Sequence, residues 1–218
     1  MPMSSRALAF AGLVAVALPA APAPAHAYTL MECYQTRDSD LEIAACTALI
    51  EAGGLTAEQL PKAHTGRGVG YARKGRYDAA IADHSRAIEL DPSYPLAWSN
   101  RGSAWSGKGD YQKAIADFTE ALARDPDHLP ALNNRAWALY KLGRAGDGLA
   151  DIERAIALKP RIAALHDTHG HILEALERRE EAIDAYRRAI ELDPAMSETR
   201  AALEALGDGA WLAAHPSK

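Results

Sequence analysis

A 34-residue period runs through most of this 218-residue sequence and limits the folds that the chain can adopt. Four prolines mark the period: Pro92, Pro126, Pro160 and Pro194. Columns of alanine and of aliphatic residues keep the same spacing, namely Ala87, Ala121, Ala155, Ala189 and Ile88, Leu122, Ile156, Ile190. Self-similarity at this period predicts a repeat architecture in which each unit packs against its neighbours.

Each unit has the pattern of two helices. A glycine interrupts three units near their middle, at Gly75, Gly109 and Gly143, and the proline that ends each unit cannot continue a helix. Aromatic residues make up only 6% of the chain, which favours close helix packing over a sheet core. We therefore predict an all-α fold, an α-solenoid of antiparallel helix pairs. The predicted units are residues 61–94, 95–128, 129–162 and 163–196.

The period and its columns resemble the tetratricopeptide repeat. Trp98, Gly102 and Trp105 match the family's large-residue, glycine and aromatic positions in the first helix, and Phe118 matches a large-residue position in the second. The resemblance covers about residues 61–194 and implies a right-handed superhelix. The chain has no nucleophile elbow and no phosphate-binding glycine loop, so we predict no enzymatic activity and no cofactor.

Arginine stands where the family usually has leucine in the first helix, and an aspartate follows it in the second helix. In three units the two residues are equally far from the turn glycine, so the hairpin should bring them together. In the fourth unit His169 and Ala185 replace both partners. We predict three partly buried, structural ion pairs. The pairs are Arg67 with Asp83, Arg101 with Asp117, and Arg135 with Asp151.

The amino terminus has the pattern of an export signal. Arg6 precedes an apolar run at 7–18, and a segment rich in small residues and proline ends at Ala27. We expect cleavage after Ala27 and a periplasmic or secreted protein, with the bacterial periplasm as first choice. The apolar run is too short to span a bilayer, so we expect no membrane insertion.

Cys33 and Cys46 are the only cysteines, and two cysteines in an exported chain predict a disulfide. Ser39 and Glu42 have the spacing of a capping box that starts a helix after a turn. A helical hairpin over residues 28–60 would then place the cysteines opposite each other. A redox-active pair is the alternative reading.

Both ends of the predicted array differ from the units between them. Residues 43–51 align with residues 81–89, which makes the cysteine hairpin a degenerate leading repeat. Residues 197–218 have the pattern of a polar capping helix, at about 198–206, followed by a tail.

Stacked hairpins leave a concave groove, lined mainly by the first helices, and the resemblance implies which side chains face it. Asparagine amides both donate and accept hydrogen bonds, and rigid aromatic residues supply contact area. We expect the groove to bind a peptide or helix of another protein. Packing between repeats is the alternative role of Trp137 and Tyr140. The expected groove residues are Ser99, Asn100, Ser103, Asn133, Asn134, Trp137, Tyr140, Asp167 and His171.

Other functional classes have weaker support in the sequence. The net charge of -5 and the scattered basic residues exclude a phosphate-binding face, so we expect no nucleic-acid partner. His166 and His169 share a helix face, but His171 points elsewhere, so we predict no metal site. A structural or self-associating protein is the alternative function, and a metal-binding protein is a weaker one.

Overall fold

The computed structural model describes residues 28–217, and the expected signal peptide at 1–27 lies outside them. The described residues form twelve α-helices and no strand, so the predicted all-α class is confirmed. The helices are α1 (Leu30–Gln35), α2 (Ser39–Ala52), α3 (Gln59–Arg73), α4 (Tyr77–Leu90), α5 (Pro95–Gly107), α6 (Tyr111–Arg124), α7 (Leu129–Lys141), α8 (Ala145–Leu158), α9 (Ala163–Ala175), α10 (Arg179–Leu192), α11 (Ser197–Ala205) and α12 (Gly209–Ala214).

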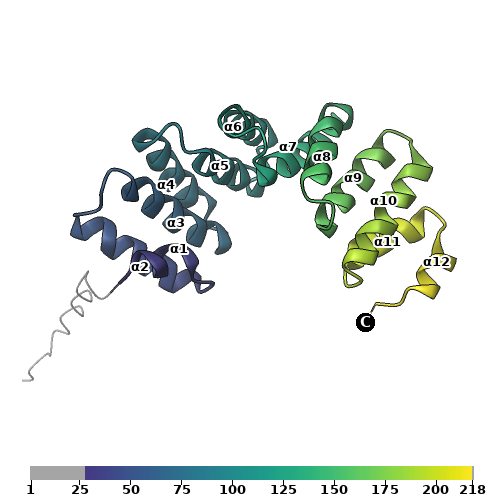
Figure 1. Ribbon diagram of the computed structural model, residues 1–218, viewed down its shortest axis with the longest axis horizontal. Coiled ribbons are helices and arrows are strands. Elements are labelled where there is room, and N and C mark those ends of the chain that lie inside the picture. The colour runs from purple at the N-terminus through teal and green to yellow at the C-terminus, as the bar shows by residue number, and fades with distance from the viewer. Residues whose placement is uncertain (1–27, 218) are drawn as a thin grey trace, which may run out of the picture.

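The helices pack in consecutive pairs that follow one another around an arch (Figure 1). The closest packing joins α3 to α4, α5 to α6, α7 to α8, and α9 to α10, and each pair also contacts the next. Helices α3, α5, α7 and α9 lie toward the inner side of the arch, and direct contacts join α3 to α5, α5 to α7 and α7 to α9. The molecule is an α-solenoid, as the sequence predicts.

The turn inside each pair needs a left-handed residue. Gly75, Gly109 and Gly143 fill this position with φ values of 70°, 81° and 73°, which a glycine adopts at no steric cost. In the fourth pair the corresponding residue is Glu177, with φ 60°. It is the one non-glycine residue with positive φ in the described part of the chain.

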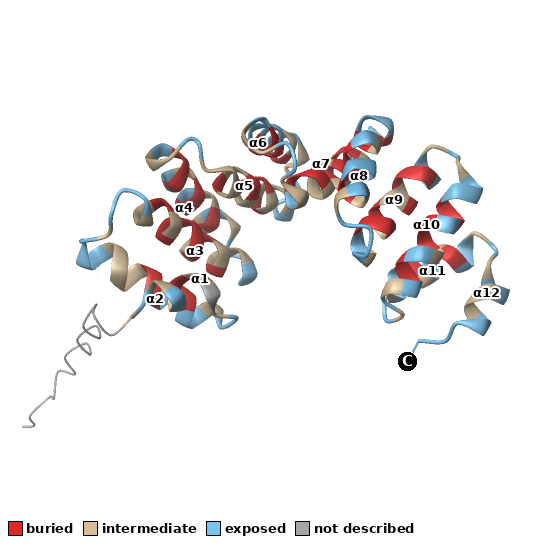
Figure 2. Cartoon of the chain, viewed as in Figure 1, coloured by how far each residue is buried: buried red, intermediate tan, exposed pale blue. Residues whose placement is uncertain are grey.

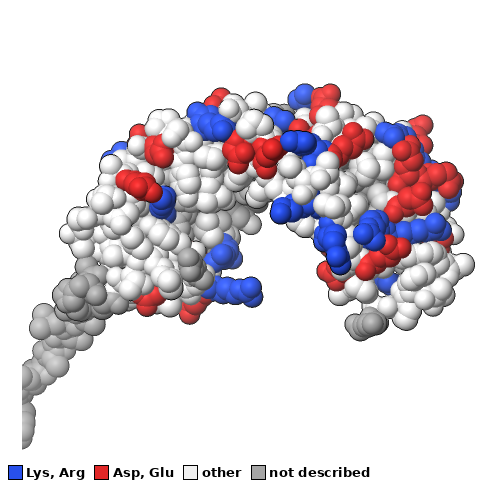
Figure 3. Space-filling view, viewed as in Figure 1, with Lys and Arg blue, Asp and Glu red and all other residues white. Residues whose placement is uncertain are grey.

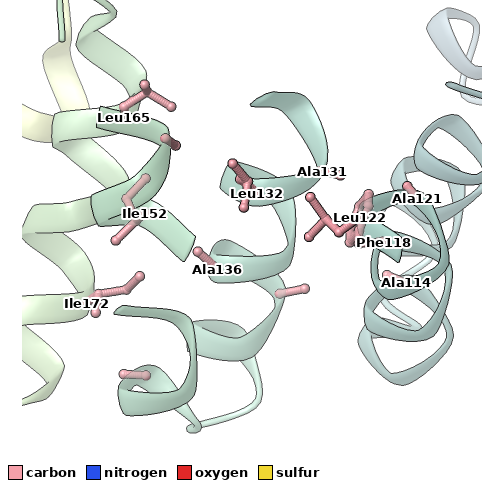
Figure 4. Close-up of a cluster of buried hydrophobic side chains, with 13 residues drawn as sticks. Ala114, Phe118, Ala121, Leu122, Ala131, Leu132, Ala136, Ile152, Leu165 and Ile172 are labelled. Atoms are coloured by element: carbon pink, nitrogen blue, oxygen red, sulfur yellow. The ribbon is translucent and has the colours of Figure 1, made fainter. Parts of the chain in front are cut away.

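The core runs along the solenoid between the helices, where Figure 2 shows the buried residues. The periodic alanines Ala87, Ala121, Ala155 and Ala189 are all 0% exposed, so the repeat columns mark where the second helices pack. Figure 4 shows part of this core, in which Phe118 of α6 and Leu132 of α7 belong to one apolar cluster that continues through α8 and α9. Neighbouring pairs from α6 to α9 therefore share one cluster instead of burying separate cores.

The disulfide between Cys33 and Cys46 joins α1 to α2, as the sequence predicts. Both cysteines are 0% exposed, and the bond lies against α3, because a Cβ on Gly66 would come within 2.4 Å of the Cys33 carbonyl oxygen. Glycine at position 66 therefore permits the leading hairpin to pack closely on the first full repeat.

The predicted cap of α2 was wrong. Asp38, not Ser39, is the N-cap, because its carboxylate accepts hydrogen bonds from two amides of the first turn. Glu42 has another role: its side chain is 1% exposed and its Oε2 lies 3.0 Å from Nη1 of Arg73 in α3. Burial raises the pKa of Glu42, and the guanidinium of Arg73 opposes that shift. This ion pair adds a second link between the leading hairpin and α3.

Two helices close the carboxyl-terminal end where the sequence predicts one. Helix α11 occupies the expected capping position, and α12 follows after a turn at Gly207. Nε of Arg187 in α10 lies 2.7 Å from Oδ2 of Asp208, and the ring of Trp211 packs on the apolar cluster of α10 and α11. The short apolar segment that forms α12 lacks a side-chain cap, which is why the sequence gives no clear sign of it.

Candidate functional site

Arginine side chains fasten the first three repeats at equivalent positions. Arg101 of α5 donates from Nε and Nη2 to both oxygens of Asp117 in α6, at 2.8 Å each. Its Nη1 also donates to the hydroxyl of Ser85 in α4, at 3.0 Å. One guanidinium therefore ties its own hairpin together and joins it to the preceding one. The equivalent sets are Arg67 with Asp83 and Thr47, and Arg135 with Asp151 and Thr119.

The hydroxyl that each arginine contacts in the preceding helix explains why the sequence of the leading hairpin aligns with the repeats. Thr47 of α2 stands at the position of Ser85, so α2 acts as the second helix of a degenerate unit. In the first set His64 adds a hydrogen bond to Asp83 at 3.0 Å. Burial alone would raise the pKa of Asp83, but the hydrogen bonds from His64 and Arg67 outweigh it and lower the pKa. These sets fix the helix pairs that carry the inner face.

Hydrogen bonds cross the inner face from α5 to α7. Asn134 donates from Nδ2 to the hydroxyl of Ser103 at 3.2 Å, and Ser103 donates to the backbone oxygen of Ser99 at 3.0 Å. Asn133 donates to the side-chain oxygen of Asn134 at 3.1 Å. Among the described residues, Oδ1 of Asn133 is a buried acceptor with no partner. The inner face therefore presents connected, partly buried amides.

One inner-face column changes exposure along the array. Thr65 and Ser99 are 3% and 1% exposed, whereas Asn133 and Asp167, at the same repeat position, are partly exposed. Ser99 is thus a correction to the predicted groove residues, because its side chain is enclosed between helices and offers no surface to a guest. The residues that remain accessible lie mainly on α7 and α9.

Aromatic rings from α7, α9 and α10 form one cluster next to these amides. The ring centroids of Trp137 and Tyr140 are 5.1 Å apart, and the imidazole of His171 lies 5.4 Å from Trp137 and 5.6 Å from Tyr140. Tyr186 meets His171 edge-on at 5.3 Å. Trp137, Tyr140 and His171 are partly exposed, so the structure brings three predicted groove residues into one accessible patch.

A polar network supports this cluster from behind. Tyr186 is 0% exposed, and its hydroxyl donates to Oε2 of Glu174 at 2.8 Å and lies 2.9 Å from Nδ1 of His171. Burial, followed by the hydrogen bond to Glu174, raises the pKa of Tyr186, so the phenol stays protonated. Asp167 accepts a 2.6 Å hydrogen bond from Thr199 of α11. His171 is thereby held by the buried phenol of Tyr186, and Trp137 and Tyr140 pack against its ring, which reduces the entropy lost on binding.

The other histidines have separate surroundings. Nε2 of His166 lies 2.9 Å from the backbone oxygen of Pro160, and His171 belongs to the aromatic cluster. Burial lowers the pKa of His169, which stands where the other repeats have arginine. Across residues 28–217 no group of three or more His, Cys, Asp or Glu side chains is placed to hold a metal ion.

The space-filling view shows a hollow between the two ends of the arch, on the side to which α5 and α7 belong (Figure 3). Within the described chain, none of the helices combines the length and apolarity needed to cross a bilayer. Stacked hairpins with an open, partly polar inner side define the class of helical repeat scaffolds.

Family models make that class specific. A TPR repeat model matches residues 68–105, and two tetratricopeptide repeat models match residues 95–128 and 163–196. The chain belongs to the tetratricopeptide repeat family, whose members are generally scaffolds that bind proteins or peptides. No curated protein matches the sequence significantly.

Solved structures support the fold. The chain is similar to MamA 41-end from Desulfovibrio magneticus RS-1, with 23% identity and a TM-score of 0.63 over 71% of this chain and 90% of that one. It is similar to TTC0263, a thermophilic TPR protein of Thermus thermophilus, with 17% identity and a TM-score of 0.62 over 77% and 90%. The second TPR domain of human RPAP3, solved with the HSP70 peptide SGPTIEEVD, matches with 26% identity and a TM-score of 0.52 over 54% and 98%.

Proposed function

We propose that this protein is a non-enzymatic interaction scaffold that holds a peptide or a helix of a partner protein in the groove on the inner side of its arch. The observation that carries the proposal is the patch formed by Trp137, Tyr140 and His171. Its rings come from two neighbouring inner helices, stay partly exposed, and lie beside the amides of Asn133 and Asn134.

This combination suits a polypeptide guest. Aromatic rings that are already fixed in place provide contact area at small entropic cost, and binding energy in protein complexes concentrates on such anchors. The amides can pair with the backbone of an extended chain, since they both donate and accept. The RPAP3 domain, which shares this fold at 26% identity, was solved with a bound peptide, and this supports a peptide as guest.

Crosslinking in the cell tests the groove. A photoreactive residue at Asn134, on the inner face, should capture a defined partner, whereas the same residue at the exposed Glu120 of α6 should not. Adding Trp137→Ala and Tyr140→Ala should weaken the Asn134 adduct, because these changes remove two of the three rings. The matched control is Trp211→Ala, which removes an indole from α12. Equal capture at both positions, or an adduct insensitive to the ring changes, would reject the groove.

We also propose that the scaffold works outside the cytoplasm, with the bacterial envelope as its compartment. The support is the signal-like segment at 1–27 together with a buried disulfide, a bond that persists in oxidising compartments. Fractionation of expressing cells followed by amino-terminal sequencing checks both parts. The protein should appear in the periplasmic or secreted fraction and begin at Tyr28. A cytoplasmic product that retains residues 1–27 would contradict the proposal.

A further inference from the structure

Three equivalent residues of each inner helix form a stripe, because positions i, i+4 and i+7 of a helix share one face. On α3, α5 and α7 every residue of this stripe is neutral, whereas on α9 two of the three are carboxylates. The stripes are Thr65, Val69 and Ala72; Ser99, Ser103 and Ser106; Asn133, Trp137 and Tyr140; and Asp167, His171 and Glu174. The α9 stripe therefore places negative charge beside the aromatic patch.

Asp167 and His171 present two hydrogen-bond acceptors next to each other. The hydroxyl of Tyr186 donates to Glu174, so it accepts from Nδ1 of His171, and Nε2 of the neutral imidazole is left as an acceptor. This nitrogen lies 3.8 Å from Oδ1 of Asp167, and the side chains of His171 and Asp167 are 22% and 21% exposed. A ligand can therefore reach both groups, and each can accept a hydrogen bond from it.

Within residues 28–217, no lysine or arginine pairs with the two carboxylates of the α9 stripe. Asp167 and Glu174 each accept a hydrogen bond, but from neutral hydroxyl groups. Nζ of the exposed Lys141 lies 5.5 Å from the centroid of Trp137, so a cation can approach this ring, but it forms no ion pair with α9. The charge of the α9 stripe is therefore complementary to a cationic group on the guest.

From these features we infer that the aromatic patch, together with Asp167 and Glu174, binds an arginine side chain of the guest polypeptide. The inference rests on the proposed function for the origin of the arginine, but the surface can be tested without any partner. A guanidinium can stack on the aromatic rings while its N–H groups donate to Asp167 and His171. A lysine ammonium supplies the charge without the stacking, and an acidic side chain would be repelled by both carboxylates.

The experiment is an amide-resolved NMR titration of the purified protein with N-acetyl-argininamide, in weakly alkaline buffer of low salt. The arginine probe should perturb α7 and α9 around Trp137 and His171 with a dissociation constant on the order of 1 mM, as expected for a small ligand. N-acetyl-citrullinamide has the same shape but no charge and should bind about fivefold more weakly. N-acetyl-lysinamide should bind about threefold more weakly than the arginine probe, because an ammonium does not stack on the rings.

Amide variants remove the two charges but keep the hydrogen bonds that the side-chain oxygens accept. In Asp167→Asn with Glu174→Gln, the arginine and citrulline probes should bind within about twofold of each other. The control, Glu89→Gln with Glu120→Gln at exposed positions of α4 and α6, changes the net charge equally and should keep the preference.

Equal affinity for the arginine and citrulline probes would overturn the inference, as would a lysine probe that binds as tightly or a preference that survives the amide variants. None of these results affects the crosslinking at Asn134, which tests the groove with any guest. Failure of that crosslinking would reject the groove even if the arginine probe bound.

Discussion

In the first three repeats an arginine, an aspartate and a turn glycine hold each hairpin, whereas the fourth repeat has His169, Ala185 and Glu177 at these positions. The hydroxyl that receives the arginine from the preceding unit is also replaced, by Glu153. Three of these changes lie in the repeat that contributes His171 to the aromatic patch, and Glu153 lies in the preceding helix α8. The fourth repeat, which contributes His171 to the candidate site, therefore lacks the ion pair that joins the two helices in the other repeats.

The fourth repeat depends more on apolar contacts at the end of the array. Tyr186 and Ile190 of α10 pack with Leu203 of α11 in a cluster that α12 completes. The hydroxyl of Tyr186 also contacts His171 and Glu174 of α9. In the earlier repeats, the second helix bonds to the first through an aspartate. The comparison teaches that the ion pairs and the site use different residues in the first three repeats, whereas Tyr186 of the fourth repeat belongs both to the apolar core and to the support of His171.

We expect the largest loss of stability in the repeats where the arginine, the aspartate and the hydroxyl are all present. Asp117→Ala should lower the free energy of unfolding by about 3 kcal/mol, because it leaves the largely buried guanidinium of Arg101 without its carboxylate. Urea unfolding followed by circular dichroism measures this change. The double variant Arg101→Met with Asp117→Leu should recover most of the loss, since no buried charge remains.

A loss below 1 kcal/mol for Asp117→Ala would show that the pair is incidental. Ala185 of the fourth repeat supplies the matched position without an arginine. Ala185→Ser should change the free energy of unfolding little, because no arginine lies opposite this position.

A fall in pH gives a second test of the comparison, because each region contains a histidine whose pKa is lowered by burial. His84 is 0% exposed, stands in the column of Phe118 and Tyr186, and has a pKa lowered to about 4, chiefly by burial. Because its folded-state pKa is below the unfolded value, the unfolded state binds the proton first as the pH falls. Stability should therefore decrease from about pH 6.5 down to about pH 4. The expected loss between pH 7.5 and pH 5 is about 2 kcal/mol from His84.

His84→Phe should remove that part of the acid sensitivity, because phenylalanine occupies the same column in the next repeat. Burial also lowers the pKa of His169, so a smaller slope of the same sign should remain until His169 is replaced by glutamine. Unfolding free energies of the three proteins at several pH values provide the measurement. An unchanged slope in His84→Phe would contradict the assignment.

The sequence predicts the disulfide and the features whose residue types recur at a fixed spacing, and it misses contacts that leave no such pattern. The proline and alanine columns define the helix pairs, and the paired change at His169 and Ala185 identifies the arginine partners, because both patterns recur at a fixed spacing. The sequence does not predict the hydroxyl groups that accept from the arginines, such as that of Ser85. A serine or threonine within a helix gives no indication of which side chain it will contact. The close packing of the disulfide hairpin on α3 at Gly66 depends on tertiary contacts, which no local pattern reveals.

The smallest expected effect concerns the turn of the fourth repeat. Glu177 adopts φ 60°, a conformation that costs a side-chain-bearing residue about 1 kcal/mol relative to glycine. Glu177→Gly should therefore stabilise the protein by roughly that amount, although glycine also gives the unfolded chain more freedom, which reduces the gain. Gly143→Ala, the reverse change in the third repeat, should destabilise by a similar amount. Thermal unfolding of both variants measures these changes. If Glu177→Gly gave no gain in stability while Gly143→Ala lost stability, the conformation of Glu177 would not be strained.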